Sequence, residues 1–246
     1  MAERALMGVA FCVALGLASA APAQYVSSTH DLRTTPGSPL PEDLISGDAS
    51  FRRMAACVVE RQRTRVDYLL HAAPGSEAEV GMARSLQSRF DQCIPGYKSI
   101  SFAWNVLRGG LAEAVYHLEF PNGLGTAKTP AAEALSAWTS PRSDEAGDQQ
   151  LELLHSTARC MVAERPADVA RFLATDPLSK AEGQVVGELR DLLGACLYQG
   201  ITLTINRQSL RGLLAEAALE YGLAQRSGFA GVVMPAASHD ASKAAE

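Results

Sequence analysis

One ten-residue stretch of the sequence occurs twice in nearly the same form. Residues 107–116 read LRGGLAEAVY and residues 210–219 read LRGLLAEAAL, an offset of 103 positions. At this offset residues 55–114 match residues 158–217 at 18 of 60 positions without a gap. Chance alone would give about four identities, so the offset predicts an internal duplication.

The duplication divides the chain into two units of similar length. We expect the N-terminal unit to cover residues 48–119, the C-terminal unit to cover residues 150–226, and a linker over 120–149 to join them. Residues 24–47 are rich in Pro and Ser and predict an extended leader, whereas residues 227–246 predict a flexible C-terminal tail. Two related units are expected to pack about a pseudo-twofold axis.

The first residues have the pattern of a secretory signal peptide. A charged start precedes the apolar run ALMGVAFCVALGLASA, and Ala21-Pro22-Ala23 supplies an A-x-A cleavage pattern. We therefore expect residues 1–23 to be removed after Ala23 and the mature protein to be exported, to the periplasm or the extracellular space. An uncleaved signal that tethers the chain to a membrane is the alternative. No integral membrane span is expected in the mature chain.

Four cysteines remain after Cys12 leaves with the signal peptide, and an even number in an exported chain predicts disulfides. Cys57 and Cys93 are 36 residues apart, as are Cys160 and Cys196. Because two copies of one unit should carry the same bond, we expect the pairs 57–93 and 160–196. A bond between units, such as 57–160, is the alternative. The sequence contains no C-x-x-C, which disfavours a zinc or redox site.

Apolar residues recur every three or four positions within each unit, which predicts a mainly α fold with about four helices per unit. Ser76 and Ser179 each precede a glutamate by three residues, the pattern of a capping box at the start of a helix. In the N-terminal unit the helices are expected at 49–61, 64–72 and 77–93. In the C-terminal unit they are expected at 153–164, from Pro166 onward, and at 180–196.

The period changes after the second cysteine of each unit. Residues 99–104 and 200–206 alternate in the manner of a strand, which predicts a short strand or extended segment in each unit. A twofold arrangement would allow the two segments to pair, but the sequence leaves that pairing open. The repeated phrases then begin the last helix of each unit. A small helix is also expected in the linker, around residues 131–138.

The composition limits the classes of function. The chain is 47% hydrophobic and only 6% aromatic, which suits a buried helical core. Its formal net charge is −5, so nucleic-acid binding is not expected. A cluster of arginines at Arg61, Arg63 and Arg65, with Arg52 and Arg53 upstream, would suit an anionic partner, but a solvated helix face is the preferred interpretation.

The sequence carries no recognised catalytic or cofactor motif. The five histidines (30, 71, 117, 155 and 239) do not stand at metal-ligand spacing, and G-x-S-x-G, P-loop and H-E-x-x-H patterns do not occur. We therefore expect no cofactor, no metal and no catalytic residue. His71 and His117 align with Ala174 and Glu220 at the 103-residue offset, so the unit itself does not require histidine.

The repeated phrase has two charged members in each unit, Arg108 with Glu113 and Arg211 with Glu216. Residues five apart do not face each other on one helix. A twofold arrangement would instead allow Arg108 to meet Glu216 and Arg211 to meet Glu113. We expect a structural contact between the units, and an acid–base pair in a cleft between them is the alternative.

These features together favour an exported, disulfide-stapled helical protein. We expect a non-catalytic binding or structural module of the cell envelope whose partner is an unknown protein or envelope component. A hydrolase with its site between the two units is the alternative from a different class. The chain is not recognised as a member of a named family.

Overall fold

The computed structural model describes residues 33–34, 47–93, 100–101, 104–125, 132–139, 149–197 and 205–227. The predicted signal peptide, nearly all of the leader, and residues 228–246 of the predicted tail lie outside these ranges. The expectations for those segments therefore stay predictions. Within the described residues, no helix is long and apolar enough to cross a membrane.

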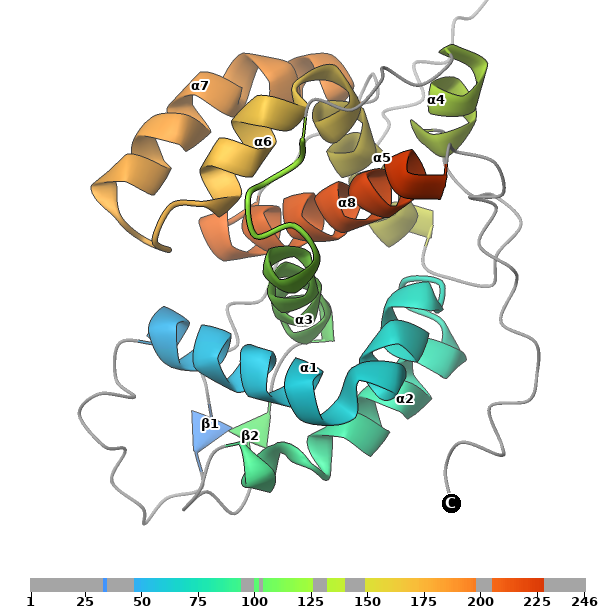
Figure 1. Cartoon of the computed structure of the whole chain (residues 1–246), viewed down its shortest axis with the longest axis vertical. Helices are drawn as coiled ribbons and strands as arrows, with labels where there is room; N and C mark the ends of the chain where they lie inside the picture. The colour runs from blue at the N-terminus through green and yellow to red at the C-terminus, as the bar shows by residue number, and fades with distance from the viewer. Residues whose placement is uncertain are drawn as a thin grey trace, which may run out of the picture.

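The protein is mainly helical, and two groups of helices lie on opposite sides of a central pair (Figure 1). The first group consists of α1 (Gly47–His71) and α2 (Glu77–Gln87). The second group consists of α5 (Gln149–Glu164), α6 (Pro166–Leu173) and α7 (Lys180–Cys196). Buried apolar residues from both groups and from the central pair form one continuous cluster.

The central pair is formed by α3 (Trp104–Glu119) and α8 (Arg207–Ser227), which pack on each other. A Cβ added to Gly109 would lie 2.5 Å from the Cα of Gly212, so the two backbones are in direct contact where the helices cross. Each residue belongs to the repeated phrase. The two glycines therefore allow close packing of the two helices that carry the predicted site residues.

The first helix of each unit is interrupted at positions 103 residues apart. In the C-terminal unit, Arg165 separates α5 from α6 with φ −140° and ψ 63°, and Pro166 begins α6 as predicted. In the N-terminal unit, Gln62 has φ −131° and ψ 31° inside α1. The predicted break between the helices at 49–61 and 64–72 is therefore confirmed: the backbone of Gln62 is not helical, and it separates the two helical stretches that together form α1.

The helix predicted at 77–93 is too long. α2 ends at Gln87, and the 3-10 helix η2 (Phe90–Gln92) leads to Cys93. The Ser88 hydroxyl donates a hydrogen bond to the carbonyl of Ser85, a local bond that competes with helix continuation. In the C-terminal unit α7 runs to Cys196, as predicted, and both serine caps form, at Ser76 for α2 and Ser179 for α7.

A short two-stranded sheet joins the leader to the N-terminal unit. β2 (Ile100–Ser101) pairs antiparallel with β1 (Arg33–Thr34). The short strand predicted in the N-terminal unit is therefore present at residues 100–101, and its partner is the leader. Residues 198–204 lie outside the described ranges.

The two disulfides have the predicted pairing. Cys57 is bonded to Cys93 and Cys160 to Cys196, with Cα separations of 5.7 and 5.8 Å. Each bond closes a loop with a sequence separation of 36 residues, which in the chain-entropy account stabilises the fold by about 3–4 kcal/mol.

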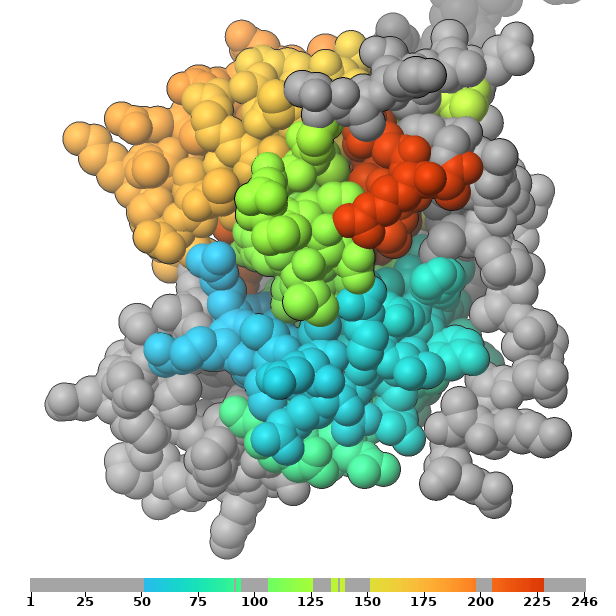
Figure 2. Space-filling view, viewed as in Figure 1, coloured from blue at the N-terminus to red at the C-terminus, as the bar shows by residue number. Residues whose placement is uncertain are grey.

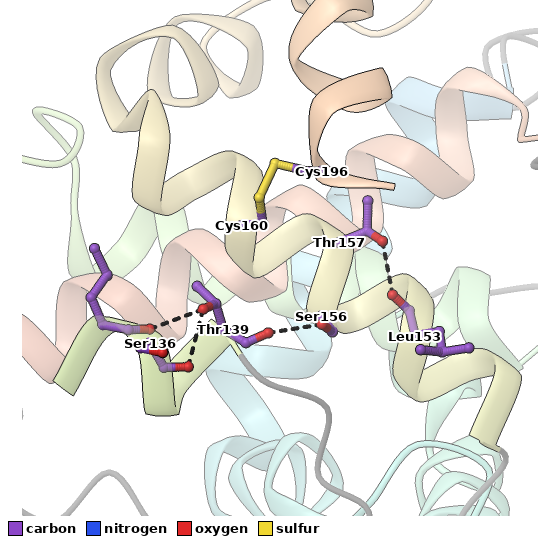
Figure 3. Close-up of a disulfide and its surroundings, with 8 residues drawn as sticks. Ser136, Thr139, Leu153, Ser156, Thr157, Cys160 and Cys196 are labelled. Carbon is purple, nitrogen blue, oxygen red and sulfur yellow. Dashed lines mark hydrogen bonds between the residues drawn. A yellow bond between two sulfur atoms is a disulfide. The ribbon is translucent and has the colours of Figure 1, made fainter. Parts of the chain in front are cut away.

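The linker helix α4 (Ala132–Thr139) lies close to the predicted range and is fastened to α5. Ser156, one turn before the Cys160–Cys196 disulfide, donates a hydrogen bond of 2.8 Å to the carbonyl of Thr139 (Figure 3). The indole of Trp138 is buried and packs against the ring of Tyr221 in α8. The linker is therefore part of the core where α4 lies.

Candidate functional site

The four charged residues of the repeated phrases form two buried ion pairs between α3 and α8. Arg108 donates from Nη2 to Glu216 Oε1 at 2.6 Å and from Nε to both carboxylate oxygens at 2.9 Å. Arg211 donates from Nε to Glu113 Oε1 at 2.9 Å. Each arginine therefore meets the glutamate of the other helix.

Each arginine also binds the carbonyl groups at the end of a neighbouring helix. Arg108 donates to three carbonyl oxygens at the end of α1, all at 2.9 Å: Leu69, Leu70 and Ala72. Arg211 donates to three carbonyl oxygens at the end of α6 and just beyond it: Phe172, Leu173 and Thr175. These carbonyls lie at or just beyond the helix ends, where the regular helical hydrogen bonds stop, so the buried guanidinium groups act as C-terminal caps.

Each arginine has a third kind of partner, the glutamate of a capping box. Glu79 Oε1 accepts from Arg108 Nη1 at 3.3 Å, and Glu182 Oε1 accepts from Arg211 Nη1 at 3.0 Å. The other oxygen of each glutamate accepts the backbone N–H of Gly75 or Leu178, so one side chain starts a helix and binds an arginine. We call each complete set of an arginine, its two glutamates and three carbonyls a clasp.

The charges in the clasps are strongly stabilised. Burial alone would raise the pKa of Glu216, but Arg108 holds that pKa at about 2. Burial would likewise lower the pKa of Arg108, and Glu216 keeps it above its ordinary value. The pKa of Glu113 is also lowered, because His117, Arg211 and Arg52 outweigh the effect of burial. At neutral pH these groups are ionised.

One position beside each clasp carries a different residue in the two units. Arg52 and His155 are 103 residues apart, and each approaches the glutamate of the nearer clasp. Arg52 Nε lies 3.5 Å from Glu113 Oε1, whereas His155 Nδ1 lies 3.7 Å from Glu216 Oε2. Burial lowers the pKa of His155 below its ordinary value, despite the opposing effect of Glu216, so the imidazole is neutral at pH 7.

A cavity of about 220 Å³ lies beside Glu216, and we call it the His155 cavity. Its polar wall is formed by Glu79, Arg108, His155, Ser209 and Glu216. Its apolar wall is formed by Val80, Leu151, Leu154, Ile205 and Leu213.

The matching space beside Glu113, the Arg52 hollow, measures only about 30 Å³. It is lined by Phe51, Arg52, Gly110, Glu113 and Leu178 among others. The ring of Phe51 lies where a Cβ on Gly110 would be, at 2.0 Å. The positions 103 residues from Phe51 and Gly110 are Leu154 and Leu213, so a side chain fills this space on one side only.

The predicted arginine cluster does not gather into a single site. Arg63 binds Asp67 and Glu119, and Arg65 binds Gln62, all on or beside the surface of α1 and α3. On the face seen in Figure 2, the ends of α3 and α8 lie side by side, and Arg226 binds Glu119 there at 2.8 Å. These pairs are the contacts of a solvated surface, where each is worth about 0–1 kcal/mol.

Comparisons of the chain with known protein families, with curated proteins and with solved structures found no match. In the part of the chain that the structure describes, no group of three or more His, Cys, Asp or Glu side chains is placed to hold a metal ion.

The sequence reasoning found the two arginine–glutamate pairs but missed several of their partners. The capping-box pattern predicts Glu79 and Glu182 as helix caps but not as partners of the arginines, and the bound carbonyls carry no sequence signal of their own. Histidine does not recur at the 103-residue offset, so the similarity of the two units gives no indication of a role for His155. The signal that would have singled it out is its match to Arg52 at the 103-residue offset, since both positions face a buried glutamate.

Proposed function

We propose that this chain is an exported, non-catalytic binding module built from two copies of one helical unit. Residues 1–23 are its signal peptide, residues 48–119 and 150–226 are the copies, and the copies are related by an approximate twofold axis. The module acts in the periplasm or outside the cell, where the two disulfides are stable.

The observation that carries the non-catalytic assignment is the saturation of the arginines. All three nitrogens of the Arg108 guanidinium donate to protein acceptors, and so do all three of Arg211. A guanidinium in this state has no donor left for a substrate. A hydrolase with a Ser-His-Asp type of triad would also need a carboxylate to orient a histidine, and Glu216 is already held by Arg108.

The duplication is supported by local features that recur at the same offset of 103 residues. The helix breaks at Gln62 and Arg165, the positive φ angles of Gly75 and Leu178, and both disulfides correspond. The two clasps correspond as well, down to the carbonyl groups that each arginine binds. The helix breaks, turns and disulfides depend on local sequence, whereas the clasps depend on contacts between the units. Both kinds of feature therefore support the duplication.

The structural assignment of the clasp is tested by Glu113→Ala. Because removing one partner of a buried ion pair leaves the other charge uncompensated, we expect the free energy of unfolding to fall by about 3–5 kcal/mol. Glu119→Ala is the control, since Glu119 is a part-exposed residue paired with Arg63 and Arg226. A Glu113→Ala protein with an unchanged melting temperature would contradict the structural role.

Export is tested on the protein recovered from its native cells. Intact mass and N-terminal sequencing should show a chain that begins at Gln24, and non-reducing peptide mapping should show the 57–93 and 160–196 links. A retained Met1 would favour the membrane-tethered alternative. Free thiols would contradict the assigned compartment.

A further inference from the structure

We propose that the His155 cavity binds a small organic ammonium compound, with its cationic group at His155 and Glu216 and its hydrocarbon part against α5 and α8. This inference rests on the proposed binding role and names the class of ligand. The cavity is lined by residues of α2, α3, α5 and α8 and by the residues just before α2 and α8. It therefore lies between the two units.

The polar end of the cavity contains an unsatisfied side chain. His155 is only 6% exposed, and its nearest charged partner, Glu216 Oε2, lies at 3.7 Å, beyond hydrogen-bond reach. Among the described residues, none forms a hydrogen bond with either ring nitrogen. A buried imidazole normally has a partner, so the absence of one in a roomy cavity points to a bound group.

The charge of the wall determines the sign of that group. Two carboxylates, Glu79 and Glu216, face the cavity against one guanidinium, Arg108, which leaves a formal excess of one negative charge. The donors of Arg108 are directed at protein oxygens, so its guanidinium offers no free N–H to an anionic ligand. An ammonium group donates to the neutral imidazole and to Glu216 together, whereas a carboxylate would be repelled.

The apolar wall and the volume of the cavity limit the size and polarity of the rest of the ligand. Five apolar side chains complete the cavity: Val80, Leu151, Leu154, Ile205 and Leu213. A cavity of about 150 Å³ is known to hold benzene, so about 220 Å³ suits roughly six to nine non-hydrogen atoms. A short hydrocarbon with one amine fits both the walls and the volume.

The Arg52 hollow shows that the clasp itself does not require such a cavity. The same arrangement of arginine, glutamates and carbonyls closes there with only about 30 Å³ of space, because Phe51 packs on Gly110. Arg52 also supplies a permanent positive charge to Glu113 in place of a neutral histidine. A more open pocket of about 430 Å³ also borders Glu113, but two arginines, Arg52 and Arg53, line it with that single carboxylate. The excess of negative charge is therefore a feature of the His155 cavity and not of the spaces beside Glu113.

The first experiment titrates the full, disulfide-bonded mature protein at pH 7.5 with three probes of similar shape. These are phenethylammonium, the neutral 2-phenylethanol and the anion phenylacetate, followed by calorimetry and by the NMR signals of the His155 ring. We expect phenethylammonium to bind at least tenfold more tightly than the alcohol and to shift the His155 signals. Equal binding of the three, or preference for phenylacetate, would overturn the proposal.

Variants locate the binding. His155→Phe should remove the tenfold preference for the amine, and Leu154→Phe with Leu213→Gly, which copies the filled hollow, should abolish binding of every probe. Phe51→Leu, on the other side, is the matched control and should leave binding unchanged. Binding that persists in the Leu154→Phe, Leu213→Gly variant would overturn the assignment of the ligand to the His155 cavity. If that variant fails to fold, the NMR signals of the His155 ring in the unaltered protein test the same assignment.

The two proposals fail separately. If the unaltered protein is folded, carries both disulfides and still does not bind phenethylammonium, the proposed class of ligand is overturned and the proposed binding role is not. A Glu113→Ala protein of full stability would instead overturn the structural role of the clasp and leave the titration as it stands.

Discussion

Leu178 adopts a backbone conformation that leucine rarely takes. Its φ is +60°, and no other described non-glycine residue has a positive φ. Gly75, which is 103 residues earlier, has φ +78°. Both residues donate their N–H to the capping glutamate that follows, Glu79 or Glu182. The turn before the capped helix therefore requires the left-handed conformation, and only one unit has the residue suited to it.

Replacing Leu178 with glycine should therefore stabilise the protein. Leu178 is 60% exposed, so little packing is lost, and relief of the left-handed strain should raise the free energy of unfolding by about 1 kcal/mol. Gly75→Ala is the opposite change and should lower it by a similar amount. Urea denaturation measures both. A loss of stability in Leu178→Gly would show that the side chain contributes packing that outweighs the strain.

At the scale of helices, the crossing of α3 and α8 decides where the charged residues meet. Arg108 and Arg211 each precede a glycine, and the contact of Gly109 with Gly212 sets the distance between the helices. A longer distance would pull each guanidinium away from its glutamate on the other helix. The glycines are thus part of the clasp although they carry no side chain.

Gly109→Ala should destabilise the protein by about 1–3 kcal/mol, because the new Cβ would lie 2.5 Å from Gly212 Cα and force the helices apart. Gly187→Ala is the matched control on α7, where an added Cβ meets nothing within 4 Å. That change should stabilise by about 0.5–1 kcal/mol through helix propensity. Thermal unfolding compares the two, and a Gly109→Ala protein as stable as the control would contradict the close crossing.

Local patterns predicted the elements better than their partners. The serine caps, the start at Pro166, the linker helix and both disulfides follow from short stretches of sequence or from the common offset. The end of α2 at Gln87 and the pairing of Ile100–Ser101 with the leader do not. The first is set by a serine hydroxyl competing for a backbone carbonyl, and the second by a contact between segments far apart in the chain.

At the scale of the whole molecule, the buried charges make stability depend on pH. The pKa of Glu216 falls to about 2 on folding from an ordinary value of 4.5, so its contribution is complete above pH 4.5 and is lost as the pH falls toward 2. The pKa of His155 also falls on folding, from 6.5, so the unfolded chain takes up its proton first. Both effects therefore weaken the fold as the pH decreases.

We accordingly expect the free energy of unfolding to decline below pH 6.5, with a slope of up to about 1.4 kcal/mol per pH unit from His155, and to decline more steeply below pH 4.5. His155→Gln should remove the first decline and keep the second. His71→Gln controls for the loss of an exposed imidazole. Denaturation curves between pH 3 and 8 measure this (roughly the range in which both groups change charge), and a flat profile from pH 7 to 5 would contradict a buried neutral His155.

The clasp could be predicted only in part, for a physical reason. The identity of Arg108 and Glu216 as partners follows from the offset, since a twofold arrangement is the simplest way to pair residues that cannot meet on one helix. The carbonyl groups of α1 and α6 belong to the backbone, which is the same for every residue, so the sequence does not show which of them an arginine binds. The His155 cavity depends on positions at which the two units have different residues, and the similarity between the units gives no indication of such positions.

The crossed clasps imply that neither half of this chain is complete alone. A chain that carried one unit would keep the contact of its arginine with the carbonyls at the end of α1 or α6, but it would lose the carboxylate that the other helix of the central pair supplies. Such a chain could satisfy that arginine by pairing head to head with a second copy of itself, each lending its glutamate to the other. Because each arginine depends on a carboxylate from the other half of the chain, we expect the unfolding of either half to carry the other half with it.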